Sequence, residues 1–531
     1  MNTKQTEATT NSRLFNKNIL SVAVATAMFG GGIASAATSY LGTSAIVTGD
    51  LTTNYVLGNA TVLTISGGTS ETSYLSGFNG TIDGNGTIGA RGEVVITGNL
   101  TMRGNIGATN STGNWTLEAG NTLVLEDSMT EFNASNITLG SHSTLNFGNS
   151  TKGYNRDTVI TMGSNITMGT NSTINIGNNT TINGYIMGAA SDQGTVNVVG
   201  NFTSGGSFGT GQGGGADNDV KKLRQINVSK GNTFTLNHNA TASMMDINGT
   251  VTASGNITAD VTMGASGVLN LNNSNTWGDN AAKVVGTIKS GGSGGTAQGT
   301  LNINGTFTTQ GAIGQGGKGL AAINLSNSTW ANGFTTTFAH NVNATTIQIG
   351  TATTQNNATL QITAGGTSAG VNIAVTGNII GGGNATSADN AAGGIFLVSG
   401  NATVNGSIGT SDNILAAIQI EDGTTLTISG ADRNIYANNI TMKANNNLLA
   451  DNATLAFNGT GTTTVNGVIA GTVGGGEGLI DINTGTVSFK NTVGSASNYI
   501  GGIDVADGST MTTSSNIYAN STIKVRGTLN I

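Results

Sequence analysis

The stretch Ile418-Gln419-Ile420-Glu421-Asp422-Gly423-Thr424 returns in altered form as Ile503-Asp504-Val505-Ala506-Asp507-Gly508-Ser509. The phrase Asn-Ile-Tyr-Ala-Asn follows each copy, at 434–438 and again at 516–520. The offset is 85 residues from Asp422 to Asp507 (507 minus 422), but 82 from Tyr436 to Tyr518 (518 minus 436). A repeat whose spacing slips by a few residues is typical of stacked units joined by corners of variable length. The sequence therefore predicts a solenoid.

Apolar-polar-apolar triplets recur about every eight residues between positions 136 and 184, a period-two pattern typical of short strands. The apolar pairs are Ile137 and Leu139, Leu145 and Phe147, Ile166 and Met168, and Ile174 and Ile176. Two side chains of each triplet would point into a core and one outward. Gly and Asn between the triplets favour tight corners. Three strands and three corners make a coil of about 24 residues, within the range of solenoid repeats.

These patterns predict an all-β fold, a right-handed parallel β-helix of short strands with glycine-rich side loops. At about 4.8 Å per coil, 20 to 24 coils would form a rod on the order of 100 Å long. A hairpin sandwich would show longer alternating strands of about 5 to 6 residues. The patterns require no helix anywhere in the mature chain.

The composition supports a packed β structure over a disordered chain. Glycine makes up about 16 per cent of the sequence (84 of 531 residues), against about 7 per cent in ordinary proteins. The net charge is only -7 and proline is absent, whereas disordered chains are usually proline-rich and highly charged. Proline cannot donate to a ladder, so its absence suits strands paired on both sides. The lack of cysteine excludes disulfides and thiolate metal sites.

The amino terminus resembles an export signal. Basic residues precede the apolar run 19–29, and the small-residue pattern Ala34-Ser35-Ala36 follows it. The run is shorter than the roughly 20 residues that a membrane helix needs. We predict a signal peptide at 1–36, cleaved after Ala36, and an exported β-helical domain at 37–531; a buried strand or helix with incidental basic flanks is the alternative.

Glycine-rich insertions indicate side loops. They lie at 205–219, 291–299, 311–319, 381–394 and 474–478. A Gly-x-Ile-Gly phrase or a close variant recurs at 104–107, 311–314, 377–381 and 406–409. We expect these phrases at one corner of the coil, with the loops on one side of the rod. Asn and Thr at the corners are expected to stack into hydrogen-bond ladders.

The motif search favours no catalytic, cofactor or metal site. His142, His238 and His340 are far apart in the sequence and show no metal-ligand spacing. Residues 291–295 match Gly-x-Ser-x-Gly, but no helix pattern follows, as a nucleophile elbow requires. Residues 209–214 match a dinucleotide phrase without the helix that should come after it. We therefore expect neither a cofactor nor enzymatic activity.

Two short motifs remain as candidate structural sites. Lys221-Lys222-Leu223-Arg224 follows a glycine-rich stretch, and we predict a protease-accessible nick site at Lys221, Lys222 and Arg224, against the alternative of a solvated corner. The repeated pairs Asp422-Gly423 and Asp507-Gly508 predict turns in which the carboxylate accepts from backbone amides. Asp217-Asn218-Asp219 is too short an oxygen-rich stretch to indicate a calcium repeat. The acidic balance argues against a nucleic-acid partner.

The region from Thr403 to Ile531 resembles the passenger region of rickettsial autotransporters, the outer-membrane protein A and B or surface cell antigen family. The resemblance lies in Thr464-Val465-Asn466-Gly467-Val468-Ile469, Gly474-Gly475-Gly476-Glu477-Gly478, Thr486-Val487-Ser488-Phe489, the Asn-Ile-Tyr-Ala phrases and Gly527-Thr528-Leu529-Asn530-Ile531. It implies export, display on the bacterial surface or outer membrane, or secretion, and for many members adhesion to host cells. The sequence up to Ile531 shows no amphipathic strands of the family's membrane barrel. We therefore expect a truncated or split member, or a fragment, with the barrel translocator encoded separately.

Three functions follow as hypotheses. The first is an adhesin that contacts a host-cell receptor or matrix. The second is a surface-layer-like coat protein that self-associates. The third is a β-helix enzyme acting on polysaccharides, which would need an acid and base pair along a groove.

Overall fold

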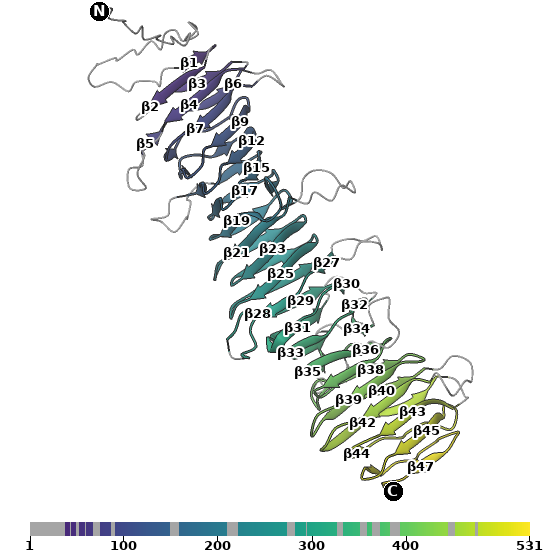
Figure 1. Ribbon diagram of the computed structural model, residues 1–531. Coiled ribbons are helices and arrows are strands. Elements are labelled where there is room, and N and C mark those ends of the chain that lie inside the picture. The colour runs from purple at the N-terminus through teal and green to yellow at the C-terminus, as the bar shows by residue number, and fades with distance from the viewer. Residues whose placement is uncertain are drawn as a thin grey trace, which may run out of the picture.

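The computed structural model describes residues 38–42, 44–48, 53–58, 60–66, 75–85, 91–148, 159–209, 221–272, 282–293, 295–326, 333–350, 358–363, 372–382, 393–443, 452–472 and 476–531. The predicted signal peptide with Ala34, Ser35 and Ala36 lies outside these residues, as does 217–219. The described strands stack into an elongated rod (Figure 1). Its first strand, β1 (Thr38–Leu41), and its last, β48 (Thr528–Asn530), lie at opposite ends.

The chain winds as a right-handed parallel β-helix over three faces, named here A, B and C in the order of travel. Face A contains β5 (Leu75–Phe78), β8 (Leu100–Met102), β10 (Thr122–Leu125), β13 (Thr144–Phe147), β16 (Thr173–Ile176), β19 (Gln193–Val198), β21 (Leu223–Val228), β28 (Ile288–Ser290), β37 (Ala402–Asn405), β39 (Thr425–Ile428), β41 (Thr454–Phe457), β43 (Glu477–Ile482), β45 (Ile500–Val505) and β47 (Ile523–Val525).

Face B contains β1, β3 (Asn54–Leu57), β6 (Ile82–Gly84), β11 (Glu131–Phe132), β14 (Ile160–Met162), β17 (Thr180–Ile182), β20 (Phe202–Ser204), β22 (Thr233–Leu236), β24 (Thr250–Ala253), β26 (Val268–Asn272), β29 (Thr300–Asn304), β31 (Leu320–Ser326), β44 (Thr486–Phe489), β46 (Thr510–Thr513) and β48. Face C contains β2 (Ala45–Thr48), β4 (Val62–Ser66), β7 (Glu93–Ile96), β9 (Thr112–Leu117), β12 (Ala134–Leu139), β15 (Asn165–Met168), β18 (Ile186–Gly188), β27 (Ala282–Val285), β30 (Phe307–Thr309), β32 (Phe334–Phe338), β34 (Ala358–Ile362), β36 (Ile395–Val398) and β38 (Leu415–Ile420).

Six longer strands bend across a corner and belong to two faces. These are β23 (Ala240–Ile247) and β25 (Ile257–Met263) from C to A, β33 (Val342–Ile349) and β35 (Ile373–Gly381) from A to B, and β40 (Asn434–Met442) and β42 (Thr462–Gly471) from B to C. We predicted three-residue strands, and these six strands are longer. At a tight corner the backbone hydrogen bonds between coils continue without a break from one face to the next.

The core is the predicted narrow apolar column. Strands such as β16 alternate half-exposed and buried residues, and Ile174 and Ile176 are fully buried while Asn175 faces outward. Buried residues from Tyr55 to Met511 form one continuous cluster. Paired residues of neighbouring coils lie from 16 apart, between Thr38 and Asn54, to 36 apart, between Gln361 and Leu397. The corners absorb this variation.

Stacked small residues form the tight corners. A Cβ atom at Gly104 would lie 1.7 Å from the Gly80 carbonyl oxygen of the coil before, and one at Gly311 would lie 2.0 Å from that of Gly286. The Ile two positions after each glycine bridges to the next coil, as Ile82 does to Ile106. The Gly-x-Ile phrase is therefore a corner motif, as predicted.

We predicted that the Gly-x-Ile phrases would all lie at one corner of the coil, and this prediction is wrong. Gly104 turns the chain from face A to face B, Gly311 turns it from C to A, and Gly467 turns it from B to C. Parallel pairing fixes the register of the strands but not the length of each corner, so the tight corner can move around the coil. The connections between strands likewise lengthen at all three corners: after β28 between faces A and B, after Ile408 between faces B and C, and after β42 between faces C and A.

Corner asparagines stack as expected, for example Asn483, which donates from Nδ2 to Asn458 Oδ1 over 3.0 Å, but a longer amide ladder runs along the strands. Asn175, Asn197 and Asn227 each donate from Nδ2 to the Oδ1 of the preceding asparagine, starting at Asn146, over 2.8 Å. These residues are paired across β13, β16, β19 and β21. Outward mid-strand positions are in register at every coil, whereas corners shift, so the ladder forms on the strands.

Helical structure in the described ranges is confined to the 3-10 turn η2 (Gln315–Gly317). No helix in the described part of the chain is long and apolar enough to cross a membrane.

Candidate functional site

The candidate site is a notch at the corner between faces A and B. It is a cavity of about 400 Å³. Its lining residues are Gly295, Ala297, Gly317, Gly319, Asn343, Ala344, Thr345, Thr376, Gly377, Asn378, Asn405, Gly406 and Arg433. The corner is tight in the coils of β33, β35 and β37, and loops project before and after it. The notch forms because the corner between faces A and B is tight in these three coils, whereas the coils on either side carry loops at the same corner.

Polar groups cover the walls of the notch. Arg433 donates from Nη2 to Asn405 Oδ1 over 2.9 Å and from Nε to the Ser429 carbonyl over 3.3 Å. The Asn378 Oδ1 atom accepts the Ser407 N–H over 3.0 Å. These contacts hold the amides and the guanidinium in place. The described lining residues include no carboxylate and no aromatic ring.

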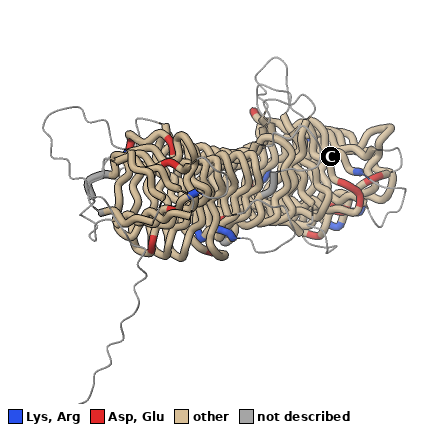
Figure 2. Tube along the Cα trace, turned by 90° about the horizontal axis from the view of Figure 1, so that it is seen from above, with Lys and Arg blue, Asp and Glu red and all other residues tan. Residues whose placement is uncertain are grey.

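The notch has a basic residue at each end, Lys318 and Arg433. Residues 280–388 contain no Asp or Glu but include Lys283, Lys289 and Lys318. Lys318 lies between two lining glycines, and Arg433 lies at the opposite end of the lining. Charged residues are sparse along the whole rod (Figure 2). A positive stretch of this length is therefore distinctive in a chain of net charge -7.

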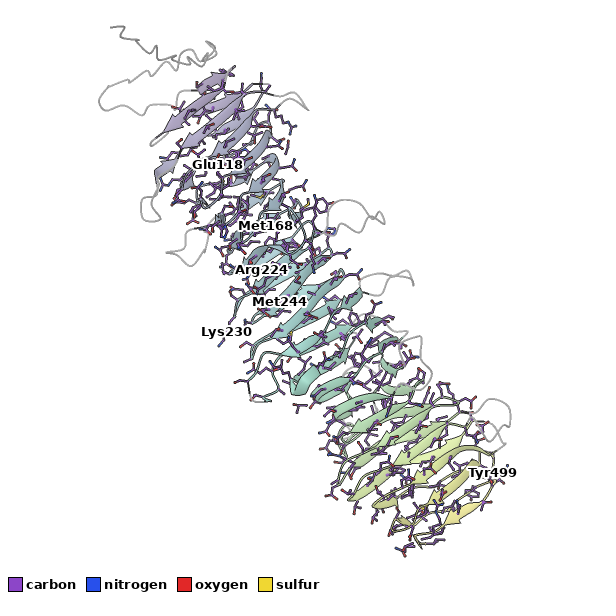
Figure 3. The ribbon with its side chains drawn as sticks, in the orientation of Figure 1. Glu118, Met168, Arg224, Lys230, Met244 and Tyr499 are labelled. Atoms are coloured by element: carbon purple, nitrogen blue, oxygen red, sulfur yellow. The ribbon has the colours of Figure 1, made fainter. Side chains whose placement is uncertain are left out.

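Of the predicted nick residues, Arg224 lies on face A in β21, and Lys221 and Lys222 come directly before that strand. Lys221 and Lys222 lie next to a turn of the preceding coil. The Lys221 and Lys222 carbonyl oxygens accept the N–H groups of Gly188 and Asp192 over 3.0 Å each. Lys222 Nζ lies 3.2 Å from Asp192 Oδ1. Arg224 projects from the middle of the rod (Figure 3) and donates to Asn171 Oδ1 over 2.8 Å. The nick hypothesis stays a prediction, and cleavage at these bonds would require local opening.

Asp192 is the acidic partner of this basic segment. The Ser243 hydroxyl donates to its carboxylate, and this bond lowers the pKa of Asp192 more than the Lys222 ammonium does. Both contacts favour the ionised carboxylate. The basic segment is therefore attached to its neighbouring coils by charge as well as by backbone bonds.

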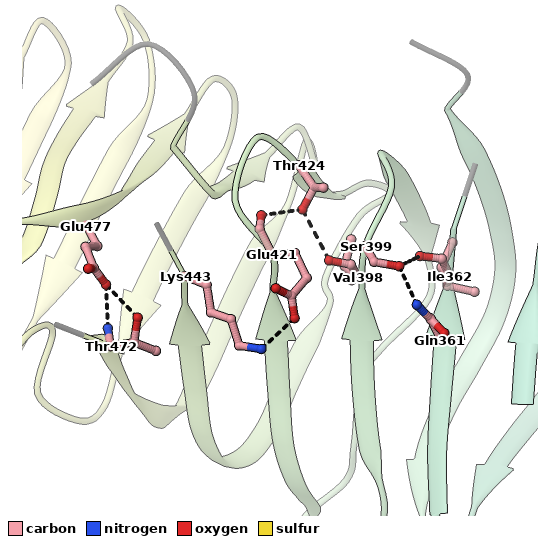
Figure 4. A network of polar contacts seen from close by, with 9 residues as sticks. All are labelled: Gln361, Ile362, Val398, Ser399, Glu421, Thr424, Lys443, Thr472 and Glu477. Atoms are coloured by element: carbon pink, nitrogen blue, oxygen red, sulfur yellow. Dashed lines mark hydrogen bonds and ion pairs between the residues drawn. The ribbon is translucent and has the colours of Figure 1, made fainter. Parts of the chain in front are cut away.

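The repeated Asp-Gly pairs lie at the centres of turns. Gly423 and Gly508 have positive φ angles of 66° and 77°, which glycine adopts without strain. Thr424 donates from its N–H and its hydroxyl to the Glu421 carbonyl, over 3.2 and 2.7 Å, and its hydroxyl also contacts the Val398 carbonyl (Figure 4). Asp422 is half-buried and Asp507 exposed. The described hydrogen bonds in the first of these turns come from backbone groups and from the Thr424 hydroxyl. The predicted hydrogen bonds from backbone amides to the two aspartate carboxylates stay a prediction.

The histidines are dispersed, as their spacing predicts. His142 has a φ of 59° and occupies a corner, where Asn171 of the next coil lies 3.2 Å from its Nε2. His238 and His340 lie in separate coils. Within the described ranges, no group of three or more His, Asp or Glu residues could hold a metal ion.

Two carboxylates have pKa values shifted in opposite directions. Burial first, and then the Asp504 carboxylate, raises the pKa of Asp481; these two residues are paired across β43 and β45. Asp504 contacts Arg526 and Lys524 over 3.1 and 3.5 Å. The pKa of Asp260 is lowered, chiefly by the Thr287 N–H and also by its hydroxyl, both 2.9 Å from Oδ1.

Sequence reasoning missed the notch. Its lining comes from six coils between residues 295 and 433, so no local motif marks it. The absence of acidic residues over 280–388 is a signal that could have drawn attention to this part of the rod.

Comparisons of this chain with protein-family models, with curated proteins and with solved structures give no match.

Proposed function

We propose that this chain is an exported surface adhesin, similar to an autotransporter passenger, that contacts host cells through the side of its rod. The observation that carries the proposal is a rigid stack with a polar, weakly charged flank, in which projecting loops enclose a notch of about 400 Å³. A concave site on a rigid element is the usual form of a binding surface. The resemblance of residues 403–531 to autotransporter passengers supports export and display.

Attachment of purified protein tests this function. Residues 37–531 should bind host cells saturably. Replacing loop residues 315–318 by a two-residue glycine linker removes one wall of the notch and should lower the attachment. The matched control shortens residues 410–413, a loop between faces B and C. Circular dichroism must show equal β content in all three proteins. Absence of saturable attachment to any host cell type would disprove the proposal.

Cleavage of polysaccharides is the second candidate, because Asp481 and Asp504 form a carboxylate pair in register with one raised pKa. Retaining glycosidases use two carboxyl groups about 5 Å apart, one of them protonated. However, Arg526 and Lys524 already contact Asp504, and the pair does not line the notch. An activity screen on glycans with wild type and Asp481→Asn tests this candidate.

A further inference from the structure

We propose that the notch between faces A and B binds an acidic oligosaccharide, with Arg433 holding a carboxylate or sulfate group of the sugar. This inference rests on the proposed function and names the class of ligand for its site. Three observations support it: the shape of the notch, its hydrogen-bond donors, and the surrounding charge.

The shape suits a short linear chain. The floor follows three neighbouring coils through Ala344, Gly377 and Gly406. At about 4.8 Å between coils, the floor extends on the order of 10 Å from the first of these coils to the third. Because the floor consists of glycine and alanine, a ligand can approach the backbone closely. The volume of about 400 Å³ falls in the range of small-molecule sites.

The donors suit an anion with hydroxyl groups. A guanidinium has five N–H donors, and the contacts of Arg433 with Asn405 and Ser429 use two of them. These contacts fix its plane, and a guanidinium can bind a carboxylate or sulfate with two parallel bonds. Since the Oδ1 atoms of Asn378 and Asn405 already accept hydrogen bonds, their amide nitrogens remain as donors for sugar oxygens. Thr345 and Thr376 add exposed hydroxyl groups.

Among the described residues, no acidic side chain forms an ion pair with Arg433. The nearest acidic residue in sequence, Asp432, accepts the Thr462 N–H over 3.0 Å and so faces the following coil. With no acidic residue over 280–388, Lys318 and Arg433 give the notch a positive potential, which favours anionic over neutral sugars. The alternative of an acidic peptide is disfavoured, because the lining offers no apolar pocket for side chains.

Calorimetry with purified residues 37–531 tests the inference. The probes are a heparin-derived tetrasaccharide, which carries sulfates and carboxylates, trigalacturonate, which carries carboxylates only, and neutral tri-N-acetylglucosamine. At least one acidic probe should bind, and the pair of acidic probes distinguishes sulfate from carboxylate recognition. Arg433→Gln should weaken that binding about tenfold or more, as expected for loss of a bidentate ion pair. Lys318→Gln, at an exposed side chain, should weaken it less.

Lys490→Gln removes the same charge from an exposed position outside the notch and is the matched control. Equal weakening by this control and by Arg433→Gln would reduce the effect to net charge and overturn the inference. Equal affinity for the neutral trimer, or no binding of either acidic probe, would also overturn it. If the wild-type protein attaches to cells but binds no acidic probe, the proposed ligand class is refuted and the adhesin proposal stands. If it binds an acidic probe but does not attach to cells, the adhesin proposal is refuted and the ligand class stands.

Discussion

At the scale of single residues, glycine at a tight corner is required because there is no room for a side chain. The Cβ position of Gly104 lies 1.7 Å from a backbone oxygen, which is far inside van der Waals contact. A backbone atom in a paired coil cannot move aside as a flexible side chain can. Glycine here therefore serves the close approach of two coils.

Gly104→Ala should destabilise the rod. We expect a loss of about 1–3 kcal/mol in the free energy of unfolding, the usual range for overpacking. The control Gly42→Ala adds a Cβ that meets nothing within 4 Å, and it should change stability by less than about 0.5 kcal/mol. Urea unfolding followed by circular dichroism measures both; equal midpoints would contradict the packing argument.

Ionisation of the Asp481 carboxyl group should lower the free energy of unfolding of the rod as the pH rises. Its pKa is raised in the fold, so the folded chain holds this proton more tightly than the unfolded chain. The stabilisation is present below the ordinary value of 3.8 and is lost as the pH rises through the folded pKa. Asp481→Asn should therefore gain stability over wild type between pH 3 and pH 7. A constant difference across that range would contradict this.

Asp260 supplies the opposite case. Its pKa is lowered by the Thr287 contacts, so its stabilisation is present above 3.8 and disappears as the pH falls through the folded pKa. Asp260→Asn should be less stable than wild type at pH 7, and the difference should shrink toward pH 2. The two variants should thus show pH dependences of opposite sign in the same urea titrations.

At the scale of elements, the amide ladder connects strands that backbone bonds already pair. Each inner asparagine both donates and accepts over 2.8 Å, as Asn197 does between Asn175 and Asn227. Parallel strands in register place identical side chains one above another at every coil, which lets the amides align. The ladder thus adds side-chain bonds to a surface that would otherwise hydrogen-bond only to water.

Asn197→Ala should break two bonds of this ladder. We expect a loss of about 1–2 kcal/mol, as for two partly exposed hydrogen bonds. Thr195→Ala, two residues earlier on the same outward side of β19, is the matched control and should cost less. A larger loss from Thr195→Ala in urea unfolding would show that the ladder contributes little.

At the scale of the whole molecule, stability is expected to be graded along the rod. Each coil contacts only its neighbours, so the end coils have fewer partners than the middle coils. Ile523 and Val525 of β47 are 38 and 39 per cent exposed, whereas Val196 and Val198 of β19 are fully buried. The apolar column therefore loses cover toward β47 and β48.

Amide hydrogen exchange should follow this gradient. The amides of the end strands β1, β2, β47 and β48 should exchange fastest among the described strands, and those of β19 and β21 slowest, because local opening is easiest where little surface is buried. Mass spectrometry after pepsin digestion measures the order. Uniform protection from β19 to β48 would mean that the rod unfolds as one cooperative unit.

The sequence alone determined the architecture. Apolar residues two apart, such as Ile174 and Ile176, specified strands with one buried side, and glycine before an isoleucine specified a corner, because both depend only on neighbouring residues. Export, with cleavage after Ala36, remains a prediction from the sequence.

Only the tertiary structure decided which corner is tight, where the loops leave, and that Gly295 and Arg433 line the same notch. The reason is physical: strand pairing leaves corner length free, so the path around each coil depends on how small residues of successive coils stack. A site assembled from six coils is set by that stacking, which no local stretch of sequence encodes.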